Sequence, residues 1–502
     1  MKALRILFAV LLFAPFCSFA QQITFSEPFR EDSKDMDFDI IGKVNKNILI
    51  LKNIRQHYAL NIYNDSMIIQ DKVEFELPGK TFNADYIAYP DFFYLVYQYQ
   101  KKGVLYCMAV KVDGNGKRLQ DPIQLDTTSV GIMGDNKIYS TIYSEDKKRI
   151  MIFKIQRNDD VLNFATLLFD NQLQLLHKTR YQLQYNERND VMGEFMLDND
   201  GNFIFAHSSK KGSRENLSQI SLMVKKALED TFTSHRLELG GRYADEVKIK
   251  IDNRNKKYIT TSFYYKERNG NIMGLWCNIW DAVANTVFAN VYTEFNEEIR
   301  SAARSSGNTK FAFNDFFIRN IILKKDGSLF ITAEDFSSQS SGGNNNWNRF
   351  DYLYGSPFLS PYDYYYYSPY GYYYRPFSSF NRSIRYYYDN ILVINLSSKA
   401  MPEWSNIIHK QQVSDENDNY LSYCIFNTGG EIQFLYNDIS KREKLLSANI
   451  INRDGATRRN PTLKTNERGY EFMPRYAKQI GARQVIIPCT YRAQICFAKV
   501  DF

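Results

Sequence analysis

The chain has 502 residues and a formal net charge of +7, from 63 basic and 56 acidic side chains. So mild an excess over so long a chain does not indicate nucleic-acid binding. The 37 tyrosines and 36 phenylalanines favour strands, so the composition predicts an all-β protein.

The first twenty residues resemble a secretory signal peptide. Lys2 and Arg5 precede the apolar run 6–16, which is too short for a permanent membrane span. Small residues then predict cleavage after Ala20, so residues 1–20 are expected to be removed on export.

The exported part, residues 21–502, is predicted to be one domain. Cys17 raises the alternative of a lipid-modified cysteine, but such a cysteine needs a small residue before it, and Phe16 stands there. No later segment predicts a transmembrane helix. We therefore expect a periplasmic, outer-surface or extracellular protein.

A sheet unit of four strands is clearest from Asn83 to Leu125. Strands are predicted at 85–88, 92–99, 104–112 and 118–125, rich in aromatic and β-branched residues and separated by turns containing Asp, Asn, Lys, Pro and Gly. Short strands with such turns are typical of antiparallel hairpins.

The first half of this unit recurs eight times. The second strands of the copies are marked by Ile48, Phe93, Ile150, Phe203, Tyr258, Leu329, Ile432 and Val485. Most intervals are close to the roughly 40–50 residues, plus loops, of a four-stranded propeller blade. The repeats therefore resemble β-propeller repeat proteins in general, with eight blades, or seven if one repeat is an insertion. No WD, kelch or Asp-box signature identifies a specific family.

The last repeat is short by one strand. A spare strand is available at the other end of the chain, at Gln22 to Ser26. We expect this N-terminal strand to complete the last blade, because closing the ring removes an exposed sheet edge.

Two long insertions interrupt the repeats, and propeller topology places both on one face. One spans 296–309, and the other spans 336–390 within the sixth repeat. The binding candidates in the second insertion are Trp347, Tyr364, Tyr365, Tyr366, Tyr367, Tyr372, Tyr373, Tyr374, Arg382 and Arg385. Tyrosine-rich loops suit glycan or protein partners, whereas the alternative is a low-complexity loop packed on its own propeller.

The turns on the same face are rich in basic residues. They include Arg55, Lys101, Lys102, Arg157, Lys210, Lys211, Arg214, Lys266, Arg268 and Arg492. These side chains either attract an anionic ligand or are merely tolerated in solvated turns.

Familiar catalytic and metal-binding patterns are not found. No CxxC, HExxH or GxSxG motif occurs, so neither a metal site nor a cofactor is predicted. Asp198 to Asn202 resembles the start of a calcium loop, but lacks its later ligands and is interpreted as a turn. A pair of carboxylates for glycoside cleavage can be neither nominated nor excluded.

Two cysteines face each other in the last predicted hairpin. A two-residue turn at Arg492 and Ala493 would pair Cys489 with Cys496 directly across the strands. The alternatives are a disulfide, permitted by export, and two buried thiols. Cys107, Cys277 and Cys424 lie in other repeats and are expected to be free.

The leading functional hypothesis is an exported, non-enzymatic propeller that binds an envelope protein or a glycan through the face bearing the insertion. The alternative is a secreted polysaccharide-processing enzyme with acidic residues at the propeller channel.

Overall fold

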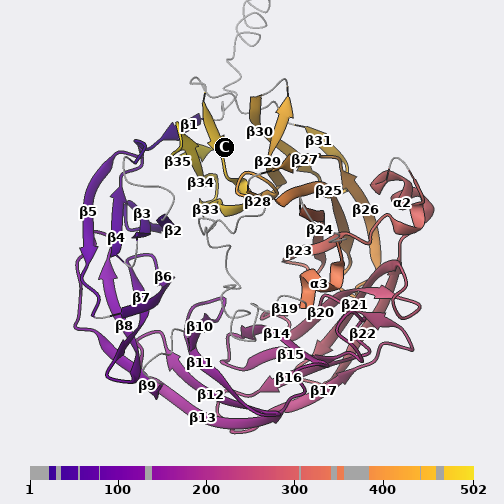
Figure 1. Ribbon diagram of the computed structural model, residues 1–502, viewed down its shortest axis with the longest axis horizontal. Helices are drawn as coiled ribbons and strands as arrows, with labels where there is room; N and C mark the ends of the chain where they lie inside the picture. Colours follow the sequence, from indigo (N-terminus) through magenta and orange to yellow (C-terminus); the bar gives the residue numbers. More distant parts are fainter. Residues whose placement is uncertain are drawn as a thin grey trace, which may run out of the picture.

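The computed structural model describes residues 22–29, 36–54, 57–78, 80–130, 138–304, 307–340, 347–354, 384–415, 417–440, 443–459 and 469–502. These residues form eight antiparallel sheets around a central axis, a β-propeller of eight blades (Figure 1). The predicted all-β propeller is confirmed, with eight blades and not seven.

Each of blades 1 to 4 contains four consecutive strands. Blade 1 contains β2 Met36–Val44, β3 Asn47–Ile54, β4 His57–Tyr63 and β5 Ile69–Phe75, and blade 2 contains β6 Lys80–Ala88, β7 Phe92–Lys101, β8 Val104–Asp113 and β9 Ile123–Ser129. Blade 3 contains β10 Tyr139–Tyr143, β11 Arg149–Asn158, β12 Val161–Asp170 and β13 Leu175–Gln184, and blade 4 contains β14 Asp190–Leu197, β15 Phe203–Ser209, β16 Gln219–Lys225 and β17 Thr233–Leu237. The predicted strand 118–125 begins later, at Ile123.

Blades 5, 6 and 8 add short strands to this plan, whereas blade 7 has four strands. Blade 5 contains β18 Tyr243–Ala244, β19 Lys248–Asp252, β20 Lys257–Tyr265, β21 Ile272–Asp281 and β22 Thr286–Glu294, and blade 6 contains β23 Phe316–Leu323, β24 Leu329–Ser340, β25 Ile384–Leu396, β26 Pro402–Ile408 and β27 Gln412–Ser414. Blade 7 contains β28 Tyr423–Asn427, β29 Ile432–Ser440, β30 Glu443–Ile451 and β31 Thr457–Arg459, and blade 8 contains β32 Tyr470–Phe472, β33 Lys478–Gly481, β34 Gln484–Tyr491 and β35 Gln494–Asp501. The helices are α2 Glu297–Ala303, α3 Arg349–Tyr354, and the 3₁₀ turns η2 Thr309–Phe311 and η4 Pro474–Tyr476. All eight repeat markers lie in the second strand of their blade, as predicted.

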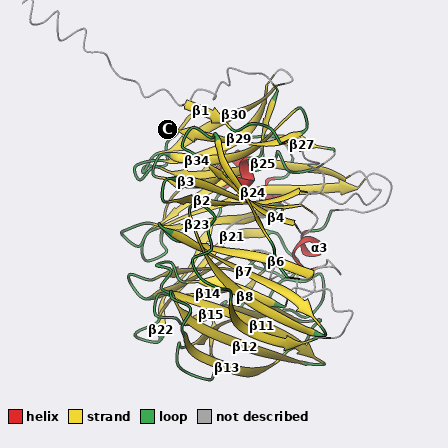
Figure 2. Ribbon diagram, turned by 90° about the vertical axis from the view of Figure 1, so that its left-hand side faces the viewer, coloured by secondary structure: helices red, strands yellow, loops and turns green. Residues whose placement is uncertain are grey.

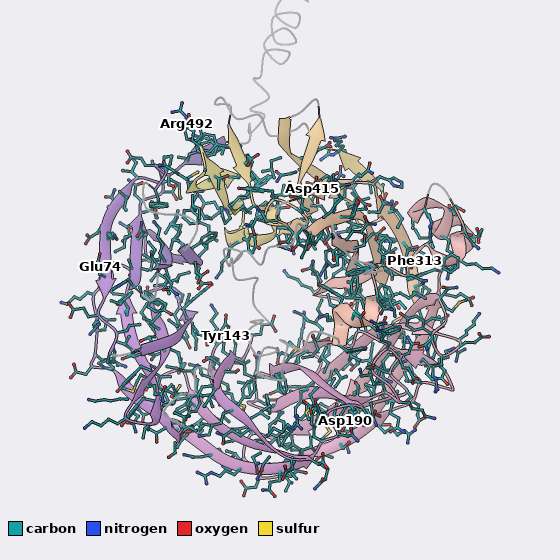
Figure 3. The ribbon with its side chains drawn as sticks, viewed as in Figure 1. Glu74, Tyr143, Asp190, Phe313, Asp415 and Arg492 are labelled. Carbon is teal, nitrogen blue, oxygen red and sulfur yellow. The ribbon has the colours of Figure 1, made fainter. Side chains whose placement is uncertain are left out.

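Strand order runs outward from the axis in each blade. Tyr143, at the end of the first strand of blade 3, faces the centre of the ring, whereas Glu74 of β5 lies on its outer edge (Figure 3). The second and third strands are buried on both faces, which explains their nearly continuous apolar sequences.

The core is divided among the blades. Eight apolar clusters each combine residues of two neighbouring blades, for example Leu60 of blade 1 with Leu95 of blade 2. A blade has no core of its own and is stabilised by burial against its neighbours, as in other repeat folds.

The N-terminal strand closes the ring. β1 (Gln22–Phe25) pairs antiparallel with β35, from Gln22 opposite Asp501 to Phe25 opposite Ala498. The backbone N–H of Ser26 donates to the Phe497 carbonyl at 2.8 Å, and the Phe25 ring stacks on Tyr470 at 3.9 Å between centroids. The predicted completion of the last blade is therefore confirmed.

A five-residue turn recurs between the third and fourth strands. The side chain of its first residue accepts hydrogen bonds from the third and fifth backbone N–H groups, at Asn64, Asp113, Asp170 and Ser397. The fourth residue adopts positive φ and is buried, as at Met67 (φ 56°) and Leu173 (φ 61°). In blade 6 this turn begins at Ser397.

The two faces of the ring differ. The first-to-second and third-to-fourth turns form what we call the hairpin-turn face, where the blades are linked by hydrogen bonds such as Asn199 N–H to Asn253 Oδ1 at 2.8 Å. The other turns, the blade connections and α3 form the insert face, beyond which β24 and β25 project (Figure 2). Among the residues described, no helix has the length and apolar character to cross a membrane.

The calcium-like loop is a hairpin turn, as interpreted from the sequence. Asp198 Oδ1 accepts hydrogen bonds from the backbone N–H groups of Asp200 and Asn202 at 3.0 and 2.8 Å. Its other oxygen accepts the Tyr258 hydroxyl at 2.8 Å. The carboxylate of Asp198 therefore serves the turn and the packing of the next blade.

Candidate functional site

A ninth apolar cluster lies outside the eight contacts that close the ring. Phe317, Phe336, Tyr388 and Leu421 form its buried part, on the insert face of blade 6. Trp347, at the end of the insertion, packs its ring 5.2 Å from Phe336. Because the eight inter-blade clusters already stabilise the ring, this aromatic cluster marks the candidate site.

Helix α3 is held at this site by buried polar contacts. Arg349 is 7% exposed, and its Nε donates to Asp245 Oδ2 at 2.5 Å, while its guanidinium lies 4.1 Å from the centroid of Phe317. Trp347 Nε1 donates to Asp315 Oδ1 at 2.7 Å, and Tyr354 Oη to the Asp245 carbonyl at 2.6 Å. The first end of the insertion is thus fixed to blades 5 and 6.

Blade 4 also contacts α3, through an exposed ion pair and a buried lysine. Arg214 forms two hydrogen bonds with the Asp351 carboxylate, at 2.7 and 2.6 Å. The Lys210 ammonium lies 4.3 Å from the centre of the Tyr354 ring. Helix α3 therefore bridges three neighbouring blades on the insert face.

A bulge between β24 and β25 brings acidic residues together. Glu334 pairs with Ile391 and Phe336 with Tyr388, which leaves Asp335 on one strand and Asp389 on the other outside the regular register. Bulges are frequent at functional sites because they redirect side chains.

The environment of Asp335 favours its protonated form. Burial raises the pKa of this half-buried carboxyl to about 7, and the carboxylates of Asp315 and Asp389 add to the effect. Burial also raises the pKa of Asp389. Among the residues described, no basic side chain lies within ion-pair distance of Asp335. Near neutral pH Asp335 can donate a hydrogen bond, while Asp315 is an acceptor.

The neighbouring Glu334 is in the opposite situation. It is fully buried, and its carboxylate lies 2.9 Å from Lys410 Nζ and 3.3 Å from Arg319 Nε. Ser422 Oγ donates to it at 2.7 Å. Glu334 is therefore compensated and structural, whereas Asp335 is not compensated.

A second polar group borders the aromatic cluster on its blade 8 side. Arg475 Nη1 donates at 2.8 Å both to Asp418 Oδ2 and to Tyr388 Oη. Burial favours the neutral acid, but Arg475 holds the pKa of Asp418 below its usual value. The Tyr388 hydroxyl also donates to Asp418, at 2.8 Å. Arg475, Asp418 and Tyr388 thus form a mutually hydrogen-bonded wall of the site.

The predicted binding residues fall into two groups. Trp347 belongs to the aromatic cluster, whereas Arg385 is exposed and forms an ion pair with Asp415. The others lie outside the described residues, namely Tyr364, Tyr365, Tyr366, Tyr367, Tyr372, Tyr373, Tyr374 and Arg382. The predicted insertion 336–390 begins and ends within strands, since β24 extends to Ser340 and β25 begins at Ile384.

The predicted basic rim is paired only in part where it is described, since Lys101, Lys102, Lys211 and Arg492 have no ion-pair partner among the described residues. Acidic partners are found for Arg157 (Glu187), Arg214 (Asp351), Lys266 (Glu294) and Arg268 (Glu215). These pairs favour the interpretation as solvated turns over a strong field for anions.

The two cysteines of the last hairpin lie opposite each other. Tyr491 pairs with Gln494 and Cys489 with Cys496, so the predicted register is confirmed. Their Sγ atoms are 3.1 Å apart, as buried thiols without a bond between them. The disulfide itself remains a prediction.

Asp335, Asp389, Asp315 and Arg349 were not predicted as site residues. Asp335 follows Glu334 inside a strand, and Asp389 ends a tyrosine run, so neither belongs to a motif. The only sequence feature that pointed to Asp335 and Asp389 was their position at the two ends of the long insertion.

Comparisons with known proteins identify no relative by sequence, and the likenesses to solved structures are remote. No protein-family model and no curated protein matches the sequence. Among solved structures, prolyl oligopeptidase B from Galerina marginata has 8% identity and a TM-score of 0.39 over 94% of this chain. This chain covers 56% of that protein, a little over half of its length.

Two further structures match more of their own length. An oligogalacturonate lyase in complex with manganese has 8% identity and a TM-score of 0.38, with 96% of this chain and 97% of the other covered. The β-propeller domain of the Trilobed protease from Pyrococcus furiosus, described as having an open velcro topology, has 9% identity and a TM-score of 0.36, with coverage of 87% and 97%. Such values carry no argument about the activity of this chain.

Proposed function

We propose that the protein is an exported, non-enzymatic propeller of the cell envelope that binds a glycan through its insert face. The observation that carries the proposal is the ninth cluster, in which aromatic rings lie beside the half-buried acids of the β24–β25 bulge. Sugars are commonly bound by aromatic faces together with a few fixed polar groups. The buried rings of the cluster support the partly exposed rings of Trp347 and Tyr352, which are the faces available here.

The charges narrow the class of glycan. Asp315, Asp335 and Asp389 supply acidic oxygens at the base of the insertion, while four of the basic residues of the rim have acidic partners. An anionic polysaccharide would be repelled by those of the three acids that are ionised. We therefore infer a neutral or basic glycan, whose hydroxyl or amino groups donate hydrogen bonds to these carboxyl groups.

Export is supported by the sequence of residues 1–20, with its basic start, apolar run and small residues before the predicted cleavage position. Mass measurement of the protein purified from the envelope fraction tests this part. A first residue of Gln21 is expected, and an uncleaved N-terminus would contradict export by this route.

Binding is tested with a panel of neutral, basic and acidic glycans and envelope proteins. Two variants perturb the site. The first lacks residues 355–383, so that α3 and β25 both remain, and the second carries Asp389→Asn. Asp454→Asn, on the hairpin-turn face, is the matched control. Loss of glycan binding in both variants but not in the control is expected. Equal binding by all forms would refute the insert face as the site, and binding of proteins only would change the class of ligand.

The alternative is a polysaccharide-processing enzyme, and the protonated Asp335 beside Asp389 is the observation that favours it. A raised carboxyl pKa next to a second carboxylate is the arrangement of a general acid and its partner. Prolonged incubation with each bound glycan, followed by mass analysis of products, distinguishes the two. Turnover that disappears in Asp335→Asn while binding persists would establish the enzyme.

A further inference from the structure

The exposed apolar side chains of the described residues are gathered on one face. Ten of the thirteen large ones lie in the third-to-fourth turns or within the first three residues of the fourth strands, on the hairpin-turn face. One from each of six consecutive blades shows the pattern: Ile68 is 60% exposed, Leu119 50%, Leu175 52%, Leu228 71%, Val283 79% and Met401 54%. We call these six residues the apolar arc.

Turn chemistry does not explain the apolar arc. In the recurring turn, the first residue supplies the hydrogen-bond acceptor and the fourth is buried, as Met67 and Leu173 are. Ile68 and Met401 follow the buried position and contribute only backbone groups to the turn, an N–H that donates and a carbonyl that accepts. A polar residue there would satisfy the fold equally well. Single exposed apolar residues are ordinary on protein surfaces, but their recurrence in six consecutive blades on one face is not.

We propose that the hairpin-turn face rests on a lipid bilayer, with the side chains of the apolar arc inserted into the interfacial region. The arc offers one side chain per blade, with polar residues between them, and not a continuous patch. A stable protein interface needs a well-packed contact area, whereas a bilayer accepts separate apolar side chains without matching pockets.

β1 begins at the hairpin-turn face, where Gln22 is paired with Asp501. Its blade, blade 8, lies outside the six that carry the arc. The insert face is consequently directed away from the bilayer, where a glycan can reach it.

The charges predict that binding does not depend on anionic lipids. Three basic residues near the arc are paired with acids, namely Lys72 with Glu74, Lys226 with Glu229 and Lys256 with Asp200. Lys117, Arg118 and Lys399 have no ion-pair partner among the described residues, but the same set of turns also carries the acids Asp113, Asp121, Asp170 and Asp281. The face therefore presents apolar side chains without a net basic field, and salt should have little effect.

The proposal is tested by flotation of the exported protein with phosphatidylcholine vesicles. The double variant Leu228→Ser, Val283→Ser is expected to lower the partition coefficient by about tenfold, since both side chains lose their burial in lipid. The matched control is Phe311→Ser, Val413→Ser, which removes two exposed apolar residues from the insert face (47% and 44% exposed) and should bind as the unmodified protein does. Raising the salt to 0.5 M, a value chosen for strong screening, should change binding by less than about twofold.

Absence of vesicle binding by the unmodified protein would overturn the proposal, as would an equal loss in both double variants. Sedimentation velocity covers the main alternative occupant. A dimer that Leu228→Ser, Val283→Ser dissociates, without any binding to vesicles, would assign the face to a second copy of the chain. Far-UV circular dichroism of each variant verifies folding, and the glycan-binding assay is independent of all these outcomes.

Discussion

Removing the closing strand is expected to open the ring at one blade. The change is a chain that begins at Glu27 and so lacks β1 and Ser26. It deletes the four-residue ladder with β35, the hydrogen bond from Ser26 N–H to Phe497 at 2.8 Å, and the stack of Phe25 on Tyr470. The outer edge of β35 is then unpaired.

The loss of stability on removing β1 comes mainly from the contacts of its side chains. The backbone hydrogen bonds are worth about 1 kcal/mol each, and ordering each residue costs a similar amount, so these contributions nearly cancel. Ile23 and Phe25 are both half-buried. Complete burial of one such side chain stabilises a protein by roughly 1.5–3 kcal/mol, so each of these two half-buried side chains contributes about half of that value. Together with about 1 kcal/mol for the ring stack, the local free energy of opening falls by about 3 kcal/mol.

Hydrogen exchange is the right assay because repeat proteins lose stability locally before they unfold completely. Peptides covering 494–501 should lose protection by about two orders of magnitude, whereas β11 and β20 should be unchanged. Phe25→Ala should have roughly half of this effect, and Gln22→Ala, which removes an exposed side chain, almost none. Unchanged protection of β35 in the shortened chain would refute this account of closure.

Four further changes test other parts of the structure. Gly455→Ala should lower the free energy of unfolding by about 2–3 kcal/mol in denaturant titrations, because the residue has φ +85° and the new Cβ would lie 2.6 Å from the Trp404 side chain. Gly429→Ala is the control: its φ of +89° is similar but the space around it is free, so it should cost only about 1 kcal/mol. Arg349→Met leaves Asp245 buried without its cation, so exchange in 347–354 should accelerate strongly, whereas Arg214→Met, at an exposed pair, should change it little. In the exported protein, non-reducing peptide mapping should recover Cys489 and Cys496 as one disulfide-linked peptide, and two separately alkylated thiols would contradict this. Asp335→Asn should leave stability unchanged near pH 4 but raise it by about 2–4 kcal/mol at pH 8, measured by denaturant titration at both pH values.

The propeller architecture could be predicted because it depends on local sequence patterns. The second strands of the blades are continuous apolar runs, and a polar turn precedes each of them, so all eight could be located without long-range information. The partner of Gln22–Phe25 followed from a counting argument, since the last repeat lacked one strand. The pairing of Cys489 with Cys496 followed from the length of a single turn.

The candidate site could not be predicted in the same way. Asp245 and Arg349 are 104 positions apart, and only the ring and the path of the insertion bring them together. Asp335 and Asp389 are opposed through a bulge, which changes the register by an amount that no turn signals. Trp347 was selected for its residue type, but its contact with Asp315 depends on how α3 docks.

The direction of the pH effect at Asp335 separates a structural role from a functional one. A carboxyl group whose pKa is raised to about 7 in the folded chain holds a proton that the unfolded chain releases near its ordinary value of about 4. Its contribution to stability is therefore complete below about pH 4 and is lost as the pH rises toward 7, so at neutral pH and above this residue costs stability. Glu334, the next residue, avoids this cost through Lys410, Arg319 and Ser422. An acid that is kept at a cost, beside an aromatic cluster that the ring does not need, is better explained by what it binds than by what it stabilises.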